Sequence, residues 1–276
     1  MLNFLRAFFL LVLPIAPAAA AAPAEEAVQA KHARIELISQ KPDFEPGKEQ
    51  LLGVHFVMEA GWHIYWINPG DSGQPPVLKW QLPEGFHAGE IQWPRPERMQ
   101  SSSQLADYGY HDDVLLLVPL RAPSFSISSS RALPVTLDAK WLICREVCLP
   151  DHAQLQLSLS SRSGRKGDQK TEALFASAVS QLPKPLPQGW RAGAESRKEE
   201  FLVTIHAGRR LNKVEFFPLD PSQIENAAPQ KFEPSPSGGK IELKKSDQLL
   251  KPIKVLRGLL ILPGGDAYRV DAPVKQ

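Results

Sequence analysis

The sequence predicts a mainly β protein: an antiparallel β-sandwich, then a short helix, then a second, smaller β-sandwich-like domain. Short runs of alternating apolar and polar residues, separated by Gly/Pro turns, fill residues 30–160 and recur after residue 189. The 26 prolines favour many short elements over long helices. Only residues 171–179 show a clear helical spacing of apolar side chains, and Pro183 ends that pattern.

We divide the chain into a signal peptide (1–22), a first β domain (28–160), a linker with the short helix (161–188) and a second β-rich domain (189–276). The clearest strands of the first domain are 114–120, which reads as a buried strand, and the alternating runs 135–142 and 152–159. The second domain has no cysteine and a single histidine, His206. We assign no chemistry to it.

The first 22 residues have the organisation of a secretory signal peptide. Arg6 precedes the apolar run 7–13, and an alanine-rich stretch ends near Ala22, so we expect cleavage near Ala20 to Ala24. The run is shorter than the roughly 20 residues that span a bilayer, and no later segment is apolar enough to do so. No cysteine follows it closely, which excludes a lipoprotein anchor. We expect an exported chain with no membrane span in its mature part.

The charge distribution argues against a nucleic-acid partner. The formal net charge is +2, and residues of both signs are interspersed along the chain. A nucleic-acid surface would need basic residues gathered on one face.

Cys144 and Cys148 are the only cysteines, and they stand where one alternating run ends and the next begins. An exported protein with an even number of cysteines normally oxidises them, so we expect a disulfide. A bridge over so few residues stabilises by only about 2 kcal/mol and joins no distant strands. A small ring in an exposed loop can exchange readily. The spacing alone leaves a redox pair and a structural staple equally open.

A metal site is the third reading of the same segment. Cys144, Cys148 and His152 recur every four residues, and two thiolates with an imidazole suit Cu(I) or Zn²⁺. The pair Leu149-Pro150 breaks any helix that would align them, and the ligand set is small. We expect no metal and no cofactor, and keep this triad as the alternative.

Four motifs resemble the DsbD-like N-terminal domain family, also called the disulfide bond corrector family. Residues 61–73 read GWHIYWINPGDSG and resemble the family segment GWHxYWxNPGDSG. The other three are LPEGF (82–86) with IQWPRPER (91–98), DYGY (107–110), and KWLICREVCLP (140–150). The motifs are long and specific, and they span about residues 30–160.

The resemblance implies an immunoglobulin-like periplasmic module acting as a thiol–disulfide oxidoreductase. Its cysteine pair would take electrons from a membrane-embedded thiol reductase and pass them to periplasmic thioredoxin-like or disulfide-bonded proteins. Family members continue into a multi-helix membrane domain and a thioredoxin-like domain, whereas this sequence stops at Gln276. We therefore expect a separate reductase as partner. The alternative is a non-enzymatic envelope binding module with a structural disulfide or a Cu(I)-binding thiol pair.

For the exchange reaction we expect Cys148 to attack and Cys144 to resolve. Tyr108, Tyr110, Asn68 and Asp71 are candidates to cover the sulfurs. Ordinary sandwich packing of the tyrosines and a rigid turn around Asn68–Pro76 are equally open. We expect His63 to be an ordinary strand histidine with its hydrogen bonds satisfied and no acid–base role.

Overall fold

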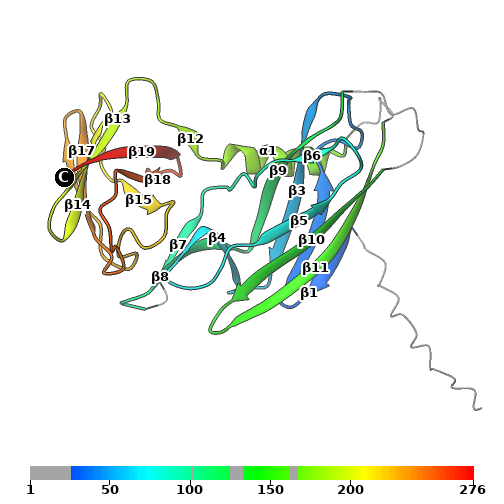
Figure 1. Cartoon of the computed structure of the whole chain (residues 1–276), viewed down its shortest axis with the longest axis horizontal. Helices are drawn as coiled ribbons and strands as arrows, with labels where there is room; N and C mark the ends of the chain where they lie inside the picture. The colour runs from blue at the N-terminus through cyan, green and yellow to red at the C-terminus, as the bar shows by residue number, and fades with distance from the viewer. Residues whose placement is uncertain (1–25, 101, 125–132, 162–166) are drawn as a thin grey trace, which may run out of the picture.

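The computed structural model describes residues 26–100, 102–124, 133–161 and 167–276, which form two β lobes and a helix that lies along the first lobe (Figure 1). The predicted signal peptide and its cleavage zone lie outside the described residues. Within the described ranges, no helix is long and apolar enough to cross a membrane.

The first lobe consists of two antiparallel sheets. One has the strand order β1-β2-β3-β9-β6 and the other β11-β10-β4-β8-β7, with β5 paired to β10. Their strands are β1 (Ala27–Ala30), β2 (Ala33–Ser39), β3 (Glu49–Met58), β4 (His63–Gly70), β5 (Val77–Gln81), β6 (His87–Ala88), β7 (Glu97–Gln100), β8 (Ala106–His111), β9 (Asp113–Arg121), β10 (Leu133–Cys144) and β11 (Cys148–Leu159).

The alternation of the sequence explains the sandwich. Side chains of a strand point to opposite faces in turn, so every second residue of β10, from Val135 to Ile143, enters the core. Trp141 meets Phe56 of the opposite sheet edge to face, with ring centroids 5.3 Å apart. The mainly β, immunoglobulin-like sandwich predicted from the sequence is confirmed.

The second lobe is one eight-stranded sheet, in which seven strands follow the order β15-β18-β19-β13-β14-β17-β16 and β12 pairs with β19. Its strands are β12 (Lys184–Pro185), β13 (Arg191–Ser196), β14 (Glu200–His206), β15 (Glu215–Pro218), β16 (Lys231–Ser235), β17 (Gly238–Lys244), β18 (Val255–Ile261) and β19 (Ala267–Lys275). Strands from both ends of this order contribute to one hydrophobic core. It contains Phe201 of β14 and Ile241 of β17 together with Phe216 of β15 and Leu260 of β18.

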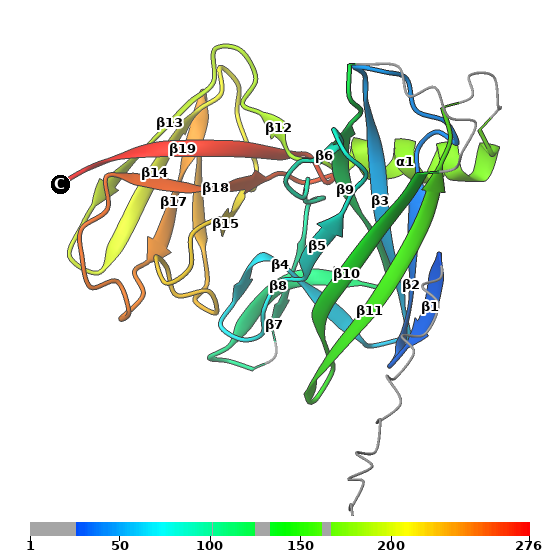
Figure 2. The ribbon, with the colours of Figure 1, turned by 45° about the vertical axis from the view of Figure 1, so that its right-hand side comes forward.

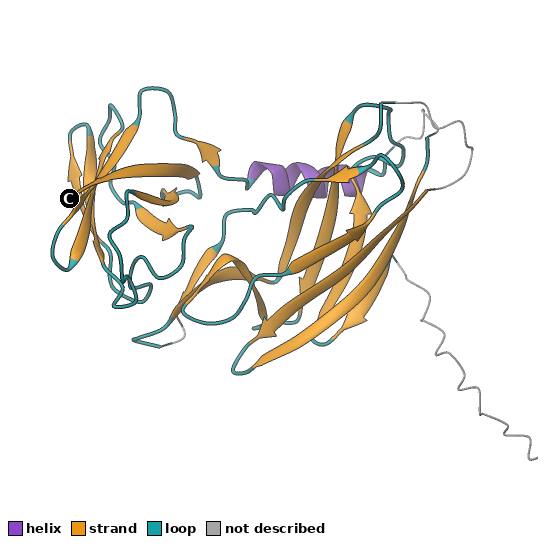
Figure 3. Ribbon diagram, in the orientation of Figure 1, coloured by secondary structure: helices purple, strands orange, loops and turns teal. Residues whose placement is uncertain are grey.

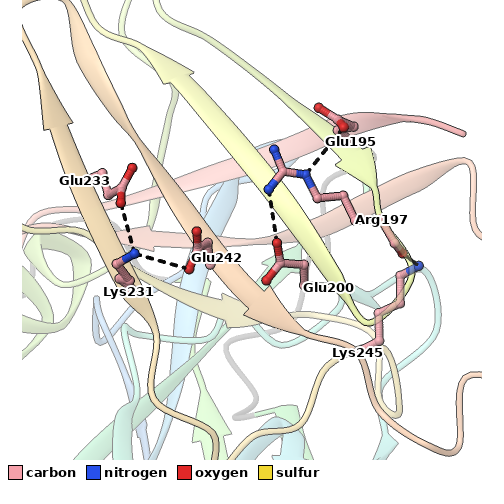
Figure 4. A network of polar contacts seen from close by, with 7 residues as sticks. All are labelled: Glu195, Arg197, Glu200, Lys231, Glu233, Glu242 and Lys245. Carbon is pink, nitrogen blue, oxygen red and sulfur yellow. Dashed lines mark hydrogen bonds and ion pairs between the residues drawn. The ribbon is translucent and has the colours of Figure 1, made fainter.

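The outward face of β13, β14, β16 and β17 carries exposed ion pairs (Figure 4). Arg197 reaches Glu200 at 3.1 Å, and Lys231 reaches Glu233 at 3.0 Å. Exposed pairs of this kind contribute little to stability. They make this face a solvated one.

The helix α1 (Gln169–Ser180) packs on the first lobe, although the sequence places it in a linker (Figure 3). Asp168 begins it, because its side chain accepts a hydrogen bond from the Thr171 backbone N–H. Phe175 and Ala178 are buried against Leu115 and Leu117 of β9. The helix thus covers the outer face of the β9 sheet.

The two lobes share a continuous apolar contact. Phe217 and Leu259 of the second lobe belong to the core cluster of the first, and the Phe217 ring lies 4.9 Å from that of Tyr108. Arg98 donates from Nε to the backbone oxygen of Asn226 at 3.0 Å. The relation between the lobes is therefore fixed by apolar packing and by partly buried hydrogen bonds.

Candidate redox site

Figure 2 shows the long β10–β11 hairpin with its turn at the lower end of the first lobe. The two cysteines form a disulfide at the tip of this hairpin. Cys144 ends β10, Cys148 begins β11, and the two are paired in the sheet register. Their Cα atoms are 4.2 Å apart. The predicted disulfide is confirmed, and the hairpin ladder explains how residues so close in sequence meet.

The two sulfur-bearing residues differ in exposure. Cys144 is 2% exposed, whereas Cys148 and the three turn residues before it are exposed. A disulfide is opened by a thiolate that reaches one of its sulfurs. Cys148 is therefore the residue of the pair that solvent reaches.

The disulfide lies on the face of the sheet that points away from the sandwich core. Ile64 and Trp66 of β4 enter the core, so the alternating His63 and Tyr65 face the other way. The register aligns Cys148 with Cys144, Cys144 with His63, and His63 with His111. A row of two cysteines and two histidines therefore crosses four neighbouring strands.

Tyr65 touches the exposed sulfur. Its hydroxyl lies 3.3 Å from Cys148 Sγ and 3.5 Å from Ser72 Oγ. Ser72 Oγ in turn donates to the Asp107 carboxylate at 2.8 Å. Burial raises the pKa of Tyr65 above its ordinary value, so the hydroxyl keeps its proton at neutral pH and can donate it in a hydrogen bond.

The segment after β4 covers the Tyr65 ring. Gly73 has φ +75°, and a Cβ atom there would lie 2.1 Å from Tyr65 Cζ, so only glycine fits. The Ser72 backbone N–H donates to Asp107 at 2.8 Å, and Asp71 accepts from the Ala106 N–H at 2.8 Å. These bonds to β8 hold the segment against the site.

The turn between the cysteines is braced by an aromatic contact. The Arg145 guanidinium carbon lies 5.2 Å from the centroid of the Trp62 ring, within cation–π range. The His32 ring stacks on Trp62 at 3.8 Å. The Arg145 charge is therefore held beside the hairpin tip.

The four residues proposed to cover the sulfurs have contacts elsewhere. Tyr108 and Tyr110 point into the core, and the Tyr110 hydroxyl donates to the Pro94 carbonyl at 2.8 Å. Asn68 Nδ2 donates to the Pro218 carbonyl at 2.8 Å, and Asp71 accepts from Asn226 Nδ2 at 2.7 Å. The structure gives all four a place in the core or at the contact between the lobes, and sets Tyr65 at the sulfur.

The structure does not bring His152 to the cysteines. His152 pairs with Lys140, four residue pairs along the hairpin from Cys144 and Cys148, or about 13 Å. That distance is too long for one ion to join the three side chains. Among the described residues no cluster of three or more His, Cys, Asp or Glu side chains is arranged to hold a metal ion.

A groove of about 660 Å³ begins two residue pairs from the disulfide. Leu142 and Pro150 of the hairpin form part of its wall, and Gln74 and Pro75 another part. The groove therefore lies along the same hairpin, a short way from the disulfide, and neither cysteine lines it.

Sequence reasoning missed Tyr65, Ser72 and Asp107. All three lie inside the motifs GWHIYWINPGDSG and DYGY, which carried the family resemblance. Their motif membership was the available signal, but their meeting at the sulfur depends on pairing β4 with β8 and β10.

The β-sandwich with its disulfide at a hairpin tip fits the class of thiol–disulfide interchange domains. The profile of the family described as "Thiol:disulfide interchange protein DsbD, N-terminal" matches residues 34–160, so this part of the chain is a DsbD-like N-terminal domain. The predicted resemblance is confirmed.

A solved structure shows the same fold. The crystal structure of the N-terminal periplasmic domain of ScsB from Proteus mirabilis superposes with a TM-score of 0.66 at 15% identity, covering 89% of this chain and 94% of that one. Because the match covers most of this chain, the likeness extends over both lobes. A comparison with curated proteins gave no match.

Proposed function

We propose that this protein is a periplasmic thiol–disulfide oxidoreductase that passes electrons through Cys144 and Cys148 to or from other envelope thiol proteins. The observation that carries the proposal is the asymmetry of the disulfide. One sulfur belongs to an exposed residue and has a tyrosine hydroxyl 3.3 Å away, and the other belongs to a buried residue. An attacking and a resolving thiol need this difference in access.

In the reduced protein, the Cys148 thiolate attacks a disulfide of the partner. One partner sulfur leaves as a thiolate, and a mixed disulfide joins Cys148 to the other. Cys144 then attacks Cys148 Sγ, the mixed disulfide breaks, and the second partner sulfur leaves. Two electrons pass to the partner, and the protein ends with the Cys144–Cys148 bond. The reverse reaction, with a dithiol donor, would reduce the Cys144–Cys148 disulfide again.

Tyr65 supports the first step as a hydrogen-bond donor. A disulfide sulfur is a weak acceptor and a thiolate a strong one, so the Tyr65 proton can turn from Ser72 toward Cys148 when the bond opens. The bond from Ser72 to Asp107 keeps the Ser72 oxygen in place throughout. The reaction needs no cofactor.

The partners are proposed by chemistry and compartment. The amino-terminal sequence supports export, and the ScsB domain of similar fold is a periplasmic one. Electrons would come from a separate membrane-embedded thiol reductase. They would go to thioredoxin-like or disulfide-bonded proteins of the periplasm.

Two single-cysteine variants test the assignment. Each is mixed with a thioredoxin-like protein whose own resolving cysteine has been removed and whose remaining cysteine is activated as a mixed disulfide. Cys144→Ala, which keeps the exposed cysteine, should accumulate the covalent adduct. Cys148→Ala should not. Equal trapping by both variants, or by neither, contradicts the proposed roles.

The reduction potential separates the proposal from an inert staple. Equilibration with glutathione buffers should give a value within the range of exchanging proteins. A potential below about −300 mV would indicate a structural disulfide and overturn the proposed function. Stoichiometric Cu(I) binding by the reduced protein, lost in the double Cys→Ser variant, would instead favour the binding module.

A further inference from the structure

His63 is a buried titratable group that the exchange reaction leaves unused. It is 8% exposed, and it stands directly opposite Cys144 in the β4–β10 register. Directly opposed residues of antiparallel strands have Cβ atoms about 4.5–5.5 Å apart. The imidazole is therefore within reach of the buried cysteine.

The imidazole has an unfilled hydrogen-bonding position. His63 Nε2 is buried and has no hydrogen-bond partner among the described residues. A buried polar atom without a partner destabilises the fold, so it needs an explanation. A Cys144 thiol could donate a hydrogen bond to His63 Nε2. The disulfide form has no such donor, because the Cys144 sulfur bears a proton only after reduction.

Resting on the proposed function, we propose that His63 is the proton acceptor for the Cys144 thiol in the resolving step. Reduction leaves Cys144 as a buried thiol, and burial in apolar surroundings disfavours its thiolate. Tyr65 contacts Cys148, so in this proposal each sulfur of the pair has its own polar partner.

The resolving step conserves protons and electrons. Cys144 Sγ–H gives its proton to His63 Nε2, and the thiolate attacks Cys148 Sγ in the mixed disulfide. The Cys144–Cys148 bond forms as the Cys148–partner bond breaks, and the electron pair leaves on the partner sulfur. The imidazolium then returns its proton to that thiolate or to water.

The surroundings keep His63 neutral and ready to accept. Burial lowers its pKa below the ordinary histidine value, and His111 lowers it further, while the Asp107 carboxylate opposes both. Its other titratable neighbours are Tyr65, with a ring 5.3 Å away, and the cysteine pair. After proton transfer, the His63 imidazolium and the Cys144 thiolate would attract each other. The disulfide form has no such pair of opposite charges at these two residues.

The aromatic disulfide DTNB separates the two chemical steps. With the reduced protein, Cys148 displaces the first TNB at a rate proportional to DTNB concentration. Cys144 then displaces the second TNB in a unimolecular phase. The first phase tests the proposed function and the second tests His63, so the failure of one can be told from the failure of the other.

His63→Gln should leave the first phase unchanged and slow the second about 100-fold at neutral pH, the usual order for loss of a proton acceptor. His152→Gln is the matched control, because this exposed histidine lies farther down the same hairpin. It should leave both phases unchanged. Second phases of equal rate in His63→Gln and in the wild type would overturn the inference.

The pH profile of the wild type tests the inference without a substitution. A neutral imidazole is present throughout the range above its pKa, so the second phase should change little from about pH 7 to 8. Without an acceptor the rate should follow the thiolate fraction and rise about tenfold per pH unit. A tenfold rise in the wild type would overturn the inference.

Discussion

Replacing Tyr65 by phenylalanine removes the hydroxyl beside Cys148 and keeps the buried ring under Gly73. A hydrogen bond to a charged acceptor contributes about 1.5–3 kcal/mol. At about 1.4 kcal/mol per factor of ten, its loss lowers the thiolate population of Cys148 roughly 10- to 150-fold. The more basic thiolate is a better nucleophile, with a Brønsted slope of about 0.45. The net slowing of the first DTNB phase is therefore about four- to fifteen-fold at neutral pH.

The assay is the first DTNB phase, together with a titration of the thiolate absorbance in the Cys144→Ala background. The titration of Cys148 should move to higher pH in Tyr65→Phe. Tyr268→Phe is the control, because Tyr268 lies in the second lobe on β19. An unchanged titration and an unchanged first phase in Tyr65→Phe would show that the hydroxyl does not stabilise the thiolate.

Three further substitutions test individual contacts in the structure: a close-packed glycine, a hydrogen bond between the lobes and the cap of α1. Gly73→Ala should destabilise the fold by clearly more than Gly189→Ala in urea unfolding. Both glycines have positive φ, but only at Gly73 does a Cβ meet a ring, so equal losses would contradict the packing. Asn226→Ala should cost about 1–3 kcal/mol by removing the bond to Asp71, whereas exposed Asn212→Ala should cost almost nothing; equal effects would exclude this brace. The backbone N–H of Thr171 lowers the pKa of Asp168, so its stabilisation of α1 is present at neutral pH and is lost as pH falls through that lowered pKa. Asp168→Asn should keep a cap and flatten this part of the acid unfolding profile; an unchanged profile would exclude the contribution.

The sequence predicted the elements whose signal is local. Alternation over 135–142 and 152–159 predicted β10 and β11, and the Gly/Pro turns predicted the sandwich. The strand β8 was recognised only as a family motif, because Tyr108-Gly109-Tyr110 is short and interrupted by glycine. The Gly109 Cα lies against the Ile64 carbonyl, which leaves no room for a Cβ atom. That close approach of two backbones cannot be read from periodicity.

The site was predictable at the cysteines and not around them. Compartment and an even cysteine count suffice for the disulfide. The contact of Tyr65 with Cys148 joins residues 83 positions apart, and the bond of Asn226 to Asp71 joins residues 155 apart. Neither can be derived from spacing along the chain. His63 was expected to be a satisfied strand histidine. The structure instead leaves its Nε2 without a hydrogen-bond partner among the described residues, and the register places it opposite Cys144.

In the proposed reaction, the contact between the lobes would give the second lobe a part without any reactive residue of its own. Asn226 of the second lobe binds Asp71, and the next residue, Ser72, binds Asp107 and lies beside the Tyr65 hydroxyl. A shift of the second lobe would therefore act on the same short segment that positions the hydroxyl at Cys148. Since loops carry reactive groups best when a rigid scaffold fixes them, the lobe is best understood as part of that scaffold. On this reasoning Asn226→Ala should also slow the first DTNB phase in the direction of Tyr65→Phe, by a smaller factor, and leave the His63-dependent second phase unchanged.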